Sequence, residues 1–245
     1  METIPITERK YELAERIDET PEVLIIKLMP DDNLHVRFDP GMFMMITGVD
    51  TAGKRYTARA YSIASDPSTQ GMEFTVIKEP KHGEHIGTSH FVEANIGDIF
   101  MLKGPNGQFR FDPKVNRKVM FIAGGTGLAP FISMLRHIKV TGSSSDVVLL
   151  YSVKYPTEVI RKDELSGYAD SIGIRLVVTV TRPQPGDGWS GQTGHADKDM
   201  IAKYAPDFKE RTMYICGPLE FVKAVKDALA ALGVQPDMVK ADVWG

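Results

Sequence analysis

The hydrophobic pattern of the chain changes once, near residues 112 to 117, and this change limits the folds that the chain can adopt. Before it, short apolar runs such as "VLIIKLM" and "DIFMLKG" are separated by Pro, Gly, Asp and Asn, which is typical of antiparallel strands. After it, apolar runs such as "DVVLLYSV" alternate with amphipathic stretches such as "PLEFVKAVKDALAAL". This alternation predicts a doubly wound parallel sheet. We therefore expect two domains, residues 1–114 and residues 115–245.

Composition excludes several classes of protein and of site. Hydrophobic residues make up 42% of the 245 residues, as in ordinary globular domains, and a net charge of -3 gives no basic field for nucleic acid or anionic lipid. No apolar run reaches the roughly 18 residues of a membrane span and the N-terminus lacks the apolar core of a signal peptide, so a cytoplasmic protein is expected. The single cysteine, Cys216, excludes an intrachain disulfide and a metal cluster held by several cysteines of this chain. We therefore expect no metal site.

The stretch "FIAGGTGLAP", residues 121–130, follows an apolar run and precedes an amphipathic one. In a parallel sheet this loop lies where the strands present their carboxyl ends to a ligand. Glycines let the backbone approach an anion, the helix start offers free N–H groups, and Pro130 suits a first helical turn. The spacing departs from Gly-x-Gly-x-x-Gly, so a tight turn without a ligand stays open as the alternative.

A second stretch, "RAYSIAS" at residues 59–65, is predicted to be a strand of the first domain. Alternation places Arg59 and Tyr61 on one face and Ala60 and Ser62 on the other. A guanidinium suits a pyrophosphate and a phenol suits stacking on a flat ring. Taken alone, this pattern is also typical of a strand with an exposed Arg and a half-buried Tyr.

Three ordered motifs together resemble one family: Arg-x-Tyr-Ser at 59–62, Gly-Gly-Thr-Gly-x-x-Pro at 124–130 and Cys-Gly-Pro at 216–218. With the change of pattern between them, they make nearly the whole chain similar to the ferredoxin–NADP reductase family. The resemblance implies a six-stranded antiparallel Greek-key barrel that holds FAD, followed by a Rossmann-like doubly wound parallel sheet that binds NAD(P)H.

The resemblance also implies a site. Arg59 would bind the flavin pyrophosphate, Tyr61 would stack on the isoalloxazine, and "IGTSHFV" would form a short helix under the pyrophosphate. The residues implied for FAD are Arg59, Ala60, Tyr61, Ser62, Val76, Ile77, Lys78, Gly87, Thr88, Ser89, Thr126 and Trp244. The residues implied for NAD(P)H are Gly125, Thr126, Gly127, Thr181, Arg182, Cys216, Gly217 and Pro218.

The residues implied beside the reacting rings are Ser62, Cys216, Asp242 and Trp244. Asp242 stands where the family often carries Glu, one methylene longer. Trp244 either covers the flavin or packs against the barrel. Cys216 either lies beside the nicotinamide or is a small buried residue, and in neither case do we expect a nucleophile.

In function, the resemblance implies an FAD-dependent NAD(P)H oxidoreductase. The main prediction is a ferredoxin–NADP reductase that exchanges single electrons with ferredoxin or flavodoxin. The alternatives are the reductase component of an oxygenase, a free-flavin or ferric reductase, and a non-catalytic flavin redox sensor. The basic stretch "KEPKH", with Lys78, Lys81 and His82, is predicted to attract an acidic protein partner.

The coenzyme is predicted from the end of the run "IRLVVTVT". In a doubly wound fold an acidic residue there accepts from the 2′-hydroxyl of the adenosine ribose. The chain has Thr181 and Arg182 instead, which resembles the Ser-Arg pair of NADPH users. The segment "WSGQTG", at 189–194, is more similar to NADH-linked reductases. NADPH is therefore predicted, with NADH as the alternative.

Overall fold

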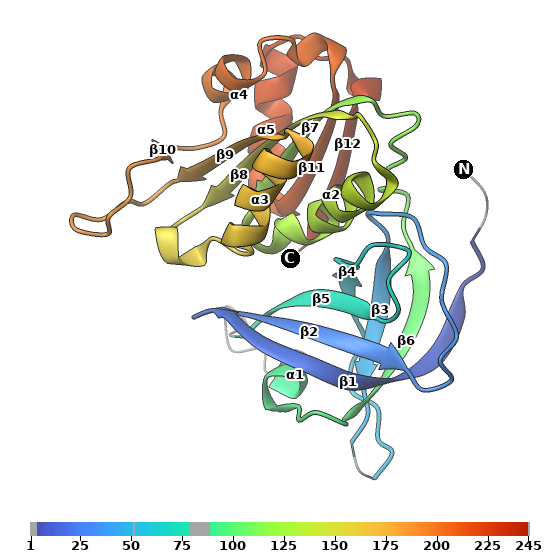
Figure 1. The fold of residues 1–245 in the computed structure, drawn as a ribbon. Coiled ribbons are helices and arrows are strands. Elements are labelled where there is room, and N and C mark those ends of the chain that lie inside the picture. Colours follow the sequence, from blue (N-terminus) through green and yellow to red (C-terminus); the bar gives the residue numbers. More distant parts are fainter. Residues whose placement is uncertain (1–3, 51, 79–88, 245) are drawn as a thin grey trace. The chain divides into compact units, whose positions relative to one another are not determined.

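A computed structural model describes residues 4–50, 52–78 and 89–244, and it divides the chain into two compact units (Figure 1). The first comprises the residues up to Phe111 together with Ile132–His137, and the second comprises Asp112–Phe131 and the residues from Ile138 onward.

The first unit is a six-stranded antiparallel barrel with strand order β4-β3-β6-β1-β2-β5. After the last residue of β4, the Ala64 N–H donates to the Glu73 carbonyl of β5 at 2.8 Å, which brings the two end strands of this order together. The elements are β1 (Thr7–Thr20), β2 (Val23–Pro30), β3 (Phe43–Gly48), β4 (Arg59–Ser62), β5 (Met72–Ile77), α1 (Ser89–Glu93) and β6 (Ile99–Asn106). The predicted barrel is confirmed.

Alternating side chains fill the barrel. Along β5 every second residue is buried, and Phe74 and Val76 are completely inaccessible to solvent. They pack with Phe100 of β6, which stacks on Phe91 of α1 with ring centroids 4.9 Å apart. The short helix α1 is thereby fixed to the core of the barrel, because one of its five residues contributes a buried ring.

The second unit is a six-stranded parallel sheet with order β10-β9-β8-β7-β11-β12, which confirms the predicted doubly wound fold. Its strands are β7 (Lys118–Gly124), β8 (Asp146–Val153), β9 (Arg175–Val180), β10 (Gln192–Thr193), β11 (Thr212–Pro218) and β12 (Val239–Trp244). Its helices are α2 (Ala129–Thr141), α3 (Lys162–Ile172), α4 (Lys198–Tyr204) and α5 (Leu219–Ala231). The chain runs outward from β7 to β10 and then returns to the other side of β7, so the order reverses between β7 and β11. Ligands of doubly wound sheets bind at such a switch point.

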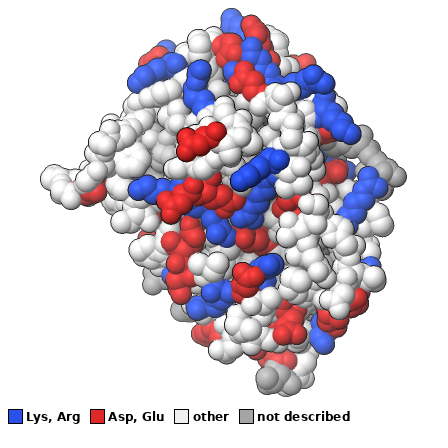
Figure 2. Space-filling model, in the orientation of Figure 1, with Lys and Arg blue, Asp and Glu red and all other residues white. Residues whose placement is uncertain are grey.

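Charged side chains of both signs lie among one another on the face drawn in Figure 2. This distribution on the drawn face agrees with the small net charge of the chain, -3. Within the part of the chain that the structure describes, no helix has the length and apolar character needed to cross a membrane.

A buried arginine holds the amino ends of the parallel strands. Arg211 is 4% exposed and donates to both carboxylate oxygens of Asp146, at 3.0 and 2.8 Å, and to Asp207 at 2.7 and 3.0 Å. Its guanidinium also donates to the Val119 carbonyl at 3.1 Å. The hydrogen bonds from Arg211 lower the pKa of Asp207 well below its usual range. One side chain therefore joins the beginnings of β7, β8 and β11.

Replacing Arg211 by Met should lower the free energy of unfolding by about 3 kcal/mol at pH 7. The carboxylates of Asp146 and Asp207 and the buried Val119 carbonyl would all lose their hydrogen-bond donor. Lys118→Met, which removes a half-exposed ammonium from the same acidic cluster, should have a much smaller effect. Asp207 stabilises the fold in its ionised form, so the difference between wild type and Arg211→Met should shrink as the pH falls below about 4. Urea unfolding at several pH values measures this, and a difference that stays constant would contradict it.

Candidate functional site

The glycine loop lies at the carboxyl end of β7, beside the carboxyl end of β11. Residues Gly125–Leu128 form a single 3-10 turn, and α2 then begins at Ala129 with Pro130 in its first turn. The position expected for the loop is therefore the position observed. The start of the 13-residue helix α2 follows this turn directly, and its first N–H, that of Ala129, donates to the Thr126 carbonyl.

Glycine is required at Gly127 and at Gly125 for different reasons. A Cβ at Gly127 would lie 2.3 Å from the Cys216 carbonyl oxygen, so this position is closed by the backbone of β11. Gly125 has a φ of +55° and no atom within 4 Å of the place of a Cβ. Gly125 therefore supplies a left-handed turn that is open on its side-chain face, which is what an approaching anion needs. Thr126, between them, is half-buried.

Cys216 and Asp242 lie opposite each other on β11 and β12, and Trp244 is paired with Pro218 two residues further on. The Cys216 side chain is 1% exposed, and burial raises the pKa of its thiol well above the usual value. Burial also raises the pKa of Asp242. The thiol at this edge therefore stays protonated at neutral pH, which agrees with the expectation that Cys216 is no nucleophile.

The structure adds a cation that the sequence reasoning missed. Beyond the last pair of β8 and β9, the Thr181 N–H donates to Val153 and the Arg182 N–H donates to Lys154, both at 2.9 Å. Lys154 and Arg182 are thus neighbours at the carboxyl edge, and neither forms an ion pair with a residue that the structure describes. The Glu158 carboxylate accepts from the backbone N–H of Lys154, at 2.9 Å. The sequence signal that could have indicated Lys154 was its position directly after the buried run of β8.

In the first unit, β4 is an end strand of the barrel. Tyr61 pairs with buried Met44 and sets its ring edge-on against Phe91, with centroids 5.1 Å apart, whereas Arg59 and Ala60 are exposed. The Tyr61 hydroxyl is buried without a hydrogen-bond partner among the described residues, and burial raises its pKa far above the usual range. A buried hydroxyl without a partner is costly, and a polar ligand at β4 would satisfy it. This feature fits the flavin implied by the sequence motif.

Other residues implied for FAD are placed less favourably or not described. Val76 faces the barrel core, and Lys78 donates to Asp18 at 2.7 Å and to the Thr20 carbonyl at 2.9 Å, so its charge is already compensated. Ile77 is the half-buried end of β5, and Ser62 is half-buried at the end of β4. Gly87, Thr88, Lys81 and His82 lie outside the described residues, and Ser89 is described only as the first residue of α1.

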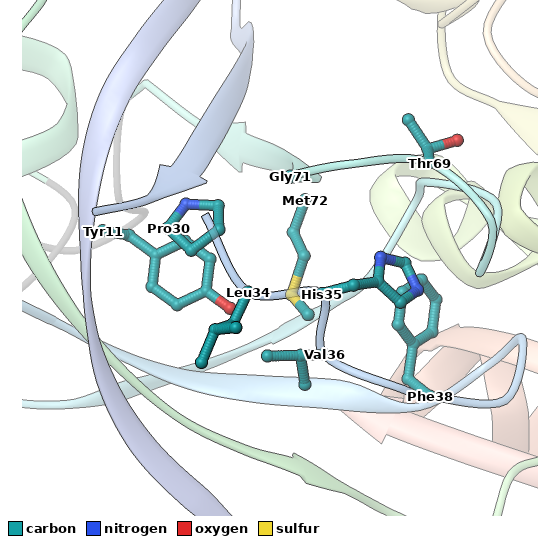
Figure 3. A pocket seen from close by; sticks show the side chains of 9 residues that line it. All are labelled: Tyr11, Pro30, Leu34, His35, Val36, Phe38, Thr69, Gly71 and Met72. Atoms are coloured by element: carbon teal, nitrogen blue, oxygen red, sulfur yellow. The ribbon is translucent and has the colours of Figure 1, made fainter. Parts of the chain in front are cut away.

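A separate hollow in the first unit has no part in this site. It is lined by Tyr11, Pro30, Leu34, His35, Val36, Phe38, Thr69, Gly71 and Met72 (Figure 3). Its volume is about 10 Å³, which is room for roughly one water molecule. None of the residues implied for a cofactor lines it.

Comparison with known proteins assigns both halves of the chain. Residues 10–111 match the model of an oxidoreductase FAD-binding domain, and residues 121–227 match that of an oxidoreductase NAD-binding domain. The chain is 31% identical over 242 residues to the glycine betaine monooxygenase reductase subunit of Pseudomonas aeruginosa, covering 93% of this chain and 65% of that protein.

Two further similarities agree with these matches. The chain is 30% identical to the stachydrine N-demethylase reductase subunit of Rhizobium meliloti, over 91% of this chain and 62% of that protein. It superimposes with a TM-score of 0.85 and 26% identity on a structure described as the ferredoxin reductase in carbazole 1,9a-dioxygenase, over 100% of this chain and 71% of the other. The chain thus spans 62% and 65% of the length of the two curated relatives.

Replacing Asp242 by Asn should stabilise the protein increasingly as the pH rises above about 4, the usual pKa of an aspartate. Because burial raises the pKa of Asp242, ionising this carboxyl costs folding free energy, and that cost appears as the pH rises through the raised pKa. The amide never ionises. Thermal midpoints of wild type and variant at several pH values measure the difference. Asp227→Asn, on the exposed face of α5, is the matched control. A difference that is flat or falls with pH would contradict the expectation.

Proposed function

We propose that this chain, which belongs to the ferredoxin-reductase-like family of oxidoreductases with an FAD-binding and an NAD-binding domain, works as the reductase component of an oxygenase. In this role it oxidises NAD(P)H and passes electrons singly to an oxygenase partner. The observation that carries the proposal is the match of both domains together with two similar proteins that are named reductase subunits of a monooxygenase and of an N-demethylase. The main prediction from the sequence, a ferredoxin–NADP reductase, has less support, because these relatives favour its alternative.

For the flavin, the proposed roles follow from β4. The Tyr61 hydroxyl would find its partner in the cofactor, and the exposed Arg59 would meet the pyrophosphate. Ser62, at the end of the same strand, would lie nearest the reacting edge of the ring. Lys78 contributes little to anion binding in this arrangement, since Asp18 compensates its charge. Residues 1–114 would therefore hold FAD.

For the nicotinamide coenzyme, the proposed roles follow from the carboxyl edge of the parallel sheet in residues 115–245. Gly125 and Thr126 would receive the pyrophosphate, and the protonated Cys216 would present no negative charge to the nicotinamide end, with Asp242 on the neighbouring strand. Arg182 and Lys154 would meet a 2′-phosphate, so NADPH is the proposed coenzyme. When bound, the flavin and the nicotinamide supply hydride and single-electron transfer, and the protein orients them and excludes water.

The acceptor is proposed to be a separate redox centre. The 245 residues contain one cysteine, so a cysteine-ligated cluster that receives the electrons would lie outside them. A ferredoxin, a flavodoxin or an oxygenase component fits this requirement, and the similar proteins favour the oxygenase component.

The purified chain loaded with FAD should bleach when NADPH or NADH is added without oxygen, and it should then reduce cytochrome c, which accepts one electron at a time. Bound flavin that does not bleach would indicate a sensor and would contradict the proposal. The acceptor is tested by comparing the oxygenase component of glycine betaine monooxygenase with a ferredoxin and a flavodoxin. Faster reduction of the oxygenase component is expected, and the reverse order would restore the ferredoxin–NADP reductase prediction.

Arg182→Ala should raise the KM for NADPH about tenfold and leave the KM for NADH nearly unchanged, because only NADPH carries the 2′-phosphate. Arg117→Ala is the matched control, since it removes an exposed guanidinium that directly precedes β7, at the opposite edge of the sheet. Steady-state reduction of cytochrome c with each coenzyme measures the effect. A wild type that prefers NADH, or an equal loss with both coenzymes, would overturn the assignment.

A further inference from the structure

Phe221, the third residue of α5, lies against the two loops at the switch point. Its ring is half-buried and packs against the apolar core of the second unit. A Cβ at Gly124 would lie 2.8 Å from the ring atom Cδ1 of Phe221, and a Cβ at Gly217 would lie 2.8 Å from the same atom. The ring therefore occupies the space that side chains at both positions would need.

These two glycines are required by space rather than by backbone conformation. Gly124 has φ and ψ of -115° and 114°, an extended conformation that any residue adopts. Gly217 also lies outside the left-handed region, since no positive φ is recorded for it. Its Cβ would additionally approach the Gly124 Cα at 3.3 Å, so the two strand ends lie close together under the ring. Alanine at either position would meet the ring first.

We propose that Phe221 is a positioning residue, whose ring fixes the Gly124–Gly127 loop relative to Cys216–Pro218 and so sets the geometry in which a nicotinamide dinucleotide binds. The proposal rests on the proposed function. The first loop contains Gly125, whose side-chain face is open, and the second carries the Cys216 carbonyl that packs on Gly127. Because the ring touches the last residue of β7 and the penultimate residue of β11, a change in its size moves both loops.

The expected loss of dinucleotide binding follows from the steric overlap between a Cβ at Gly124 and the Phe221 ring. An ordinary Cβ contact is 3.4–4 Å, so alanine at Gly124 must displace the ring or the loop by about 1 Å. A displacement of this size at a positioned reactant costs up to about a hundredfold in rate. We expect Gly124→Ala to weaken binding of the oxidised dinucleotide at least about tenfold.

The test is a compensating pair of substitutions in the FAD-loaded full chain. The probe is NADP+ or NAD+, whichever corresponds to the coenzyme that bleaches the wild type, and the readouts are its Kd by titration, the KM and kcat, and the thermal midpoint. Gly124→Ala alone should weaken binding about tenfold or more, whereas adding Gly124→Ala to Phe221→Ala should change binding less than about twofold. Phe221→Leu, which refills most of the space, should recover most of the affinity lost in Phe221→Ala. Gly217→Ala is the second steric variant if Gly124→Ala does not fold.

Phe208→Ala is the matched control, because it removes a half-buried ring that packs against the same core and precedes β11. It should lower the thermal midpoint and leave dinucleotide binding unchanged. Equal losses of binding for Gly124→Ala in both backgrounds would overturn the positioning role. Compensation seen in the thermal midpoint but absent from binding would overturn it too, leaving Phe221 a packing residue.

Failure of the proposed function has a different signature. A wild type that neither bleaches nor binds either dinucleotide would overturn the oxidoreductase assignment and the positioning role together. A wild type that bleaches and binds, with variants that show no compensation, would overturn the positioning role alone.

Discussion

The candidate site depends on the close approach of two strand ends, those of β7 and β11, at the point where the order of the parallel sheet reverses. The approach is possible because the backbone carries no Cβ where it is tightest. Gly127 lies on the Cys216 carbonyl, and Gly124 and Gly217 lie under the Phe221 ring. Among these glycines only Gly125 has no atom near the place of a Cβ, so the packing that closes the other three positions leaves this one open.

The pKa shifts of acidic groups at the two edges of the parallel sheet are opposite in direction. At the amino edge, Arg211 donates to two acids, so Asp207 stays ionised and its pKa falls. At the carboxyl edge, Cys216 is buried and Asp242 is half-buried, and desolvation outweighs the backbone hydrogen bond that each accepts, so the pKa of each rises. Burial with hydrogen-bond donors favours the charged form of an acid and burial without them favours the neutral form. Ionised Asp207 therefore stabilises the fold, whereas ionisation of Asp242 opposes it.

The local patterns in the sequence were sufficient for the elements and for the place of the glycine loop. The runs before residue 112 and after residue 117 predicted antiparallel strands and a doubly wound parallel sheet, the family resemblance added the barrel, and all are present. Contacts made over long separations were beyond these patterns. Lys154 became a candidate only when the Arg182 N–H was seen to donate to its carbonyl, and the ion pair between Lys78 and Asp18 joins strands far apart in the chain.

The sequence by itself determined which segments form strands and helices, because apolar periodicity and the positions of Gly and Pro act within a few residues. It also determined that no cysteine cluster could form from this chain. Only the tertiary structure explains why these loop positions require glycine. The ring that excludes a Cβ at Gly124 belongs to Phe221, almost a hundred residues away, and only the pairing of β7 with β11 brings the two together. Steric exclusion acts through space, so local sequence carries no trace of it.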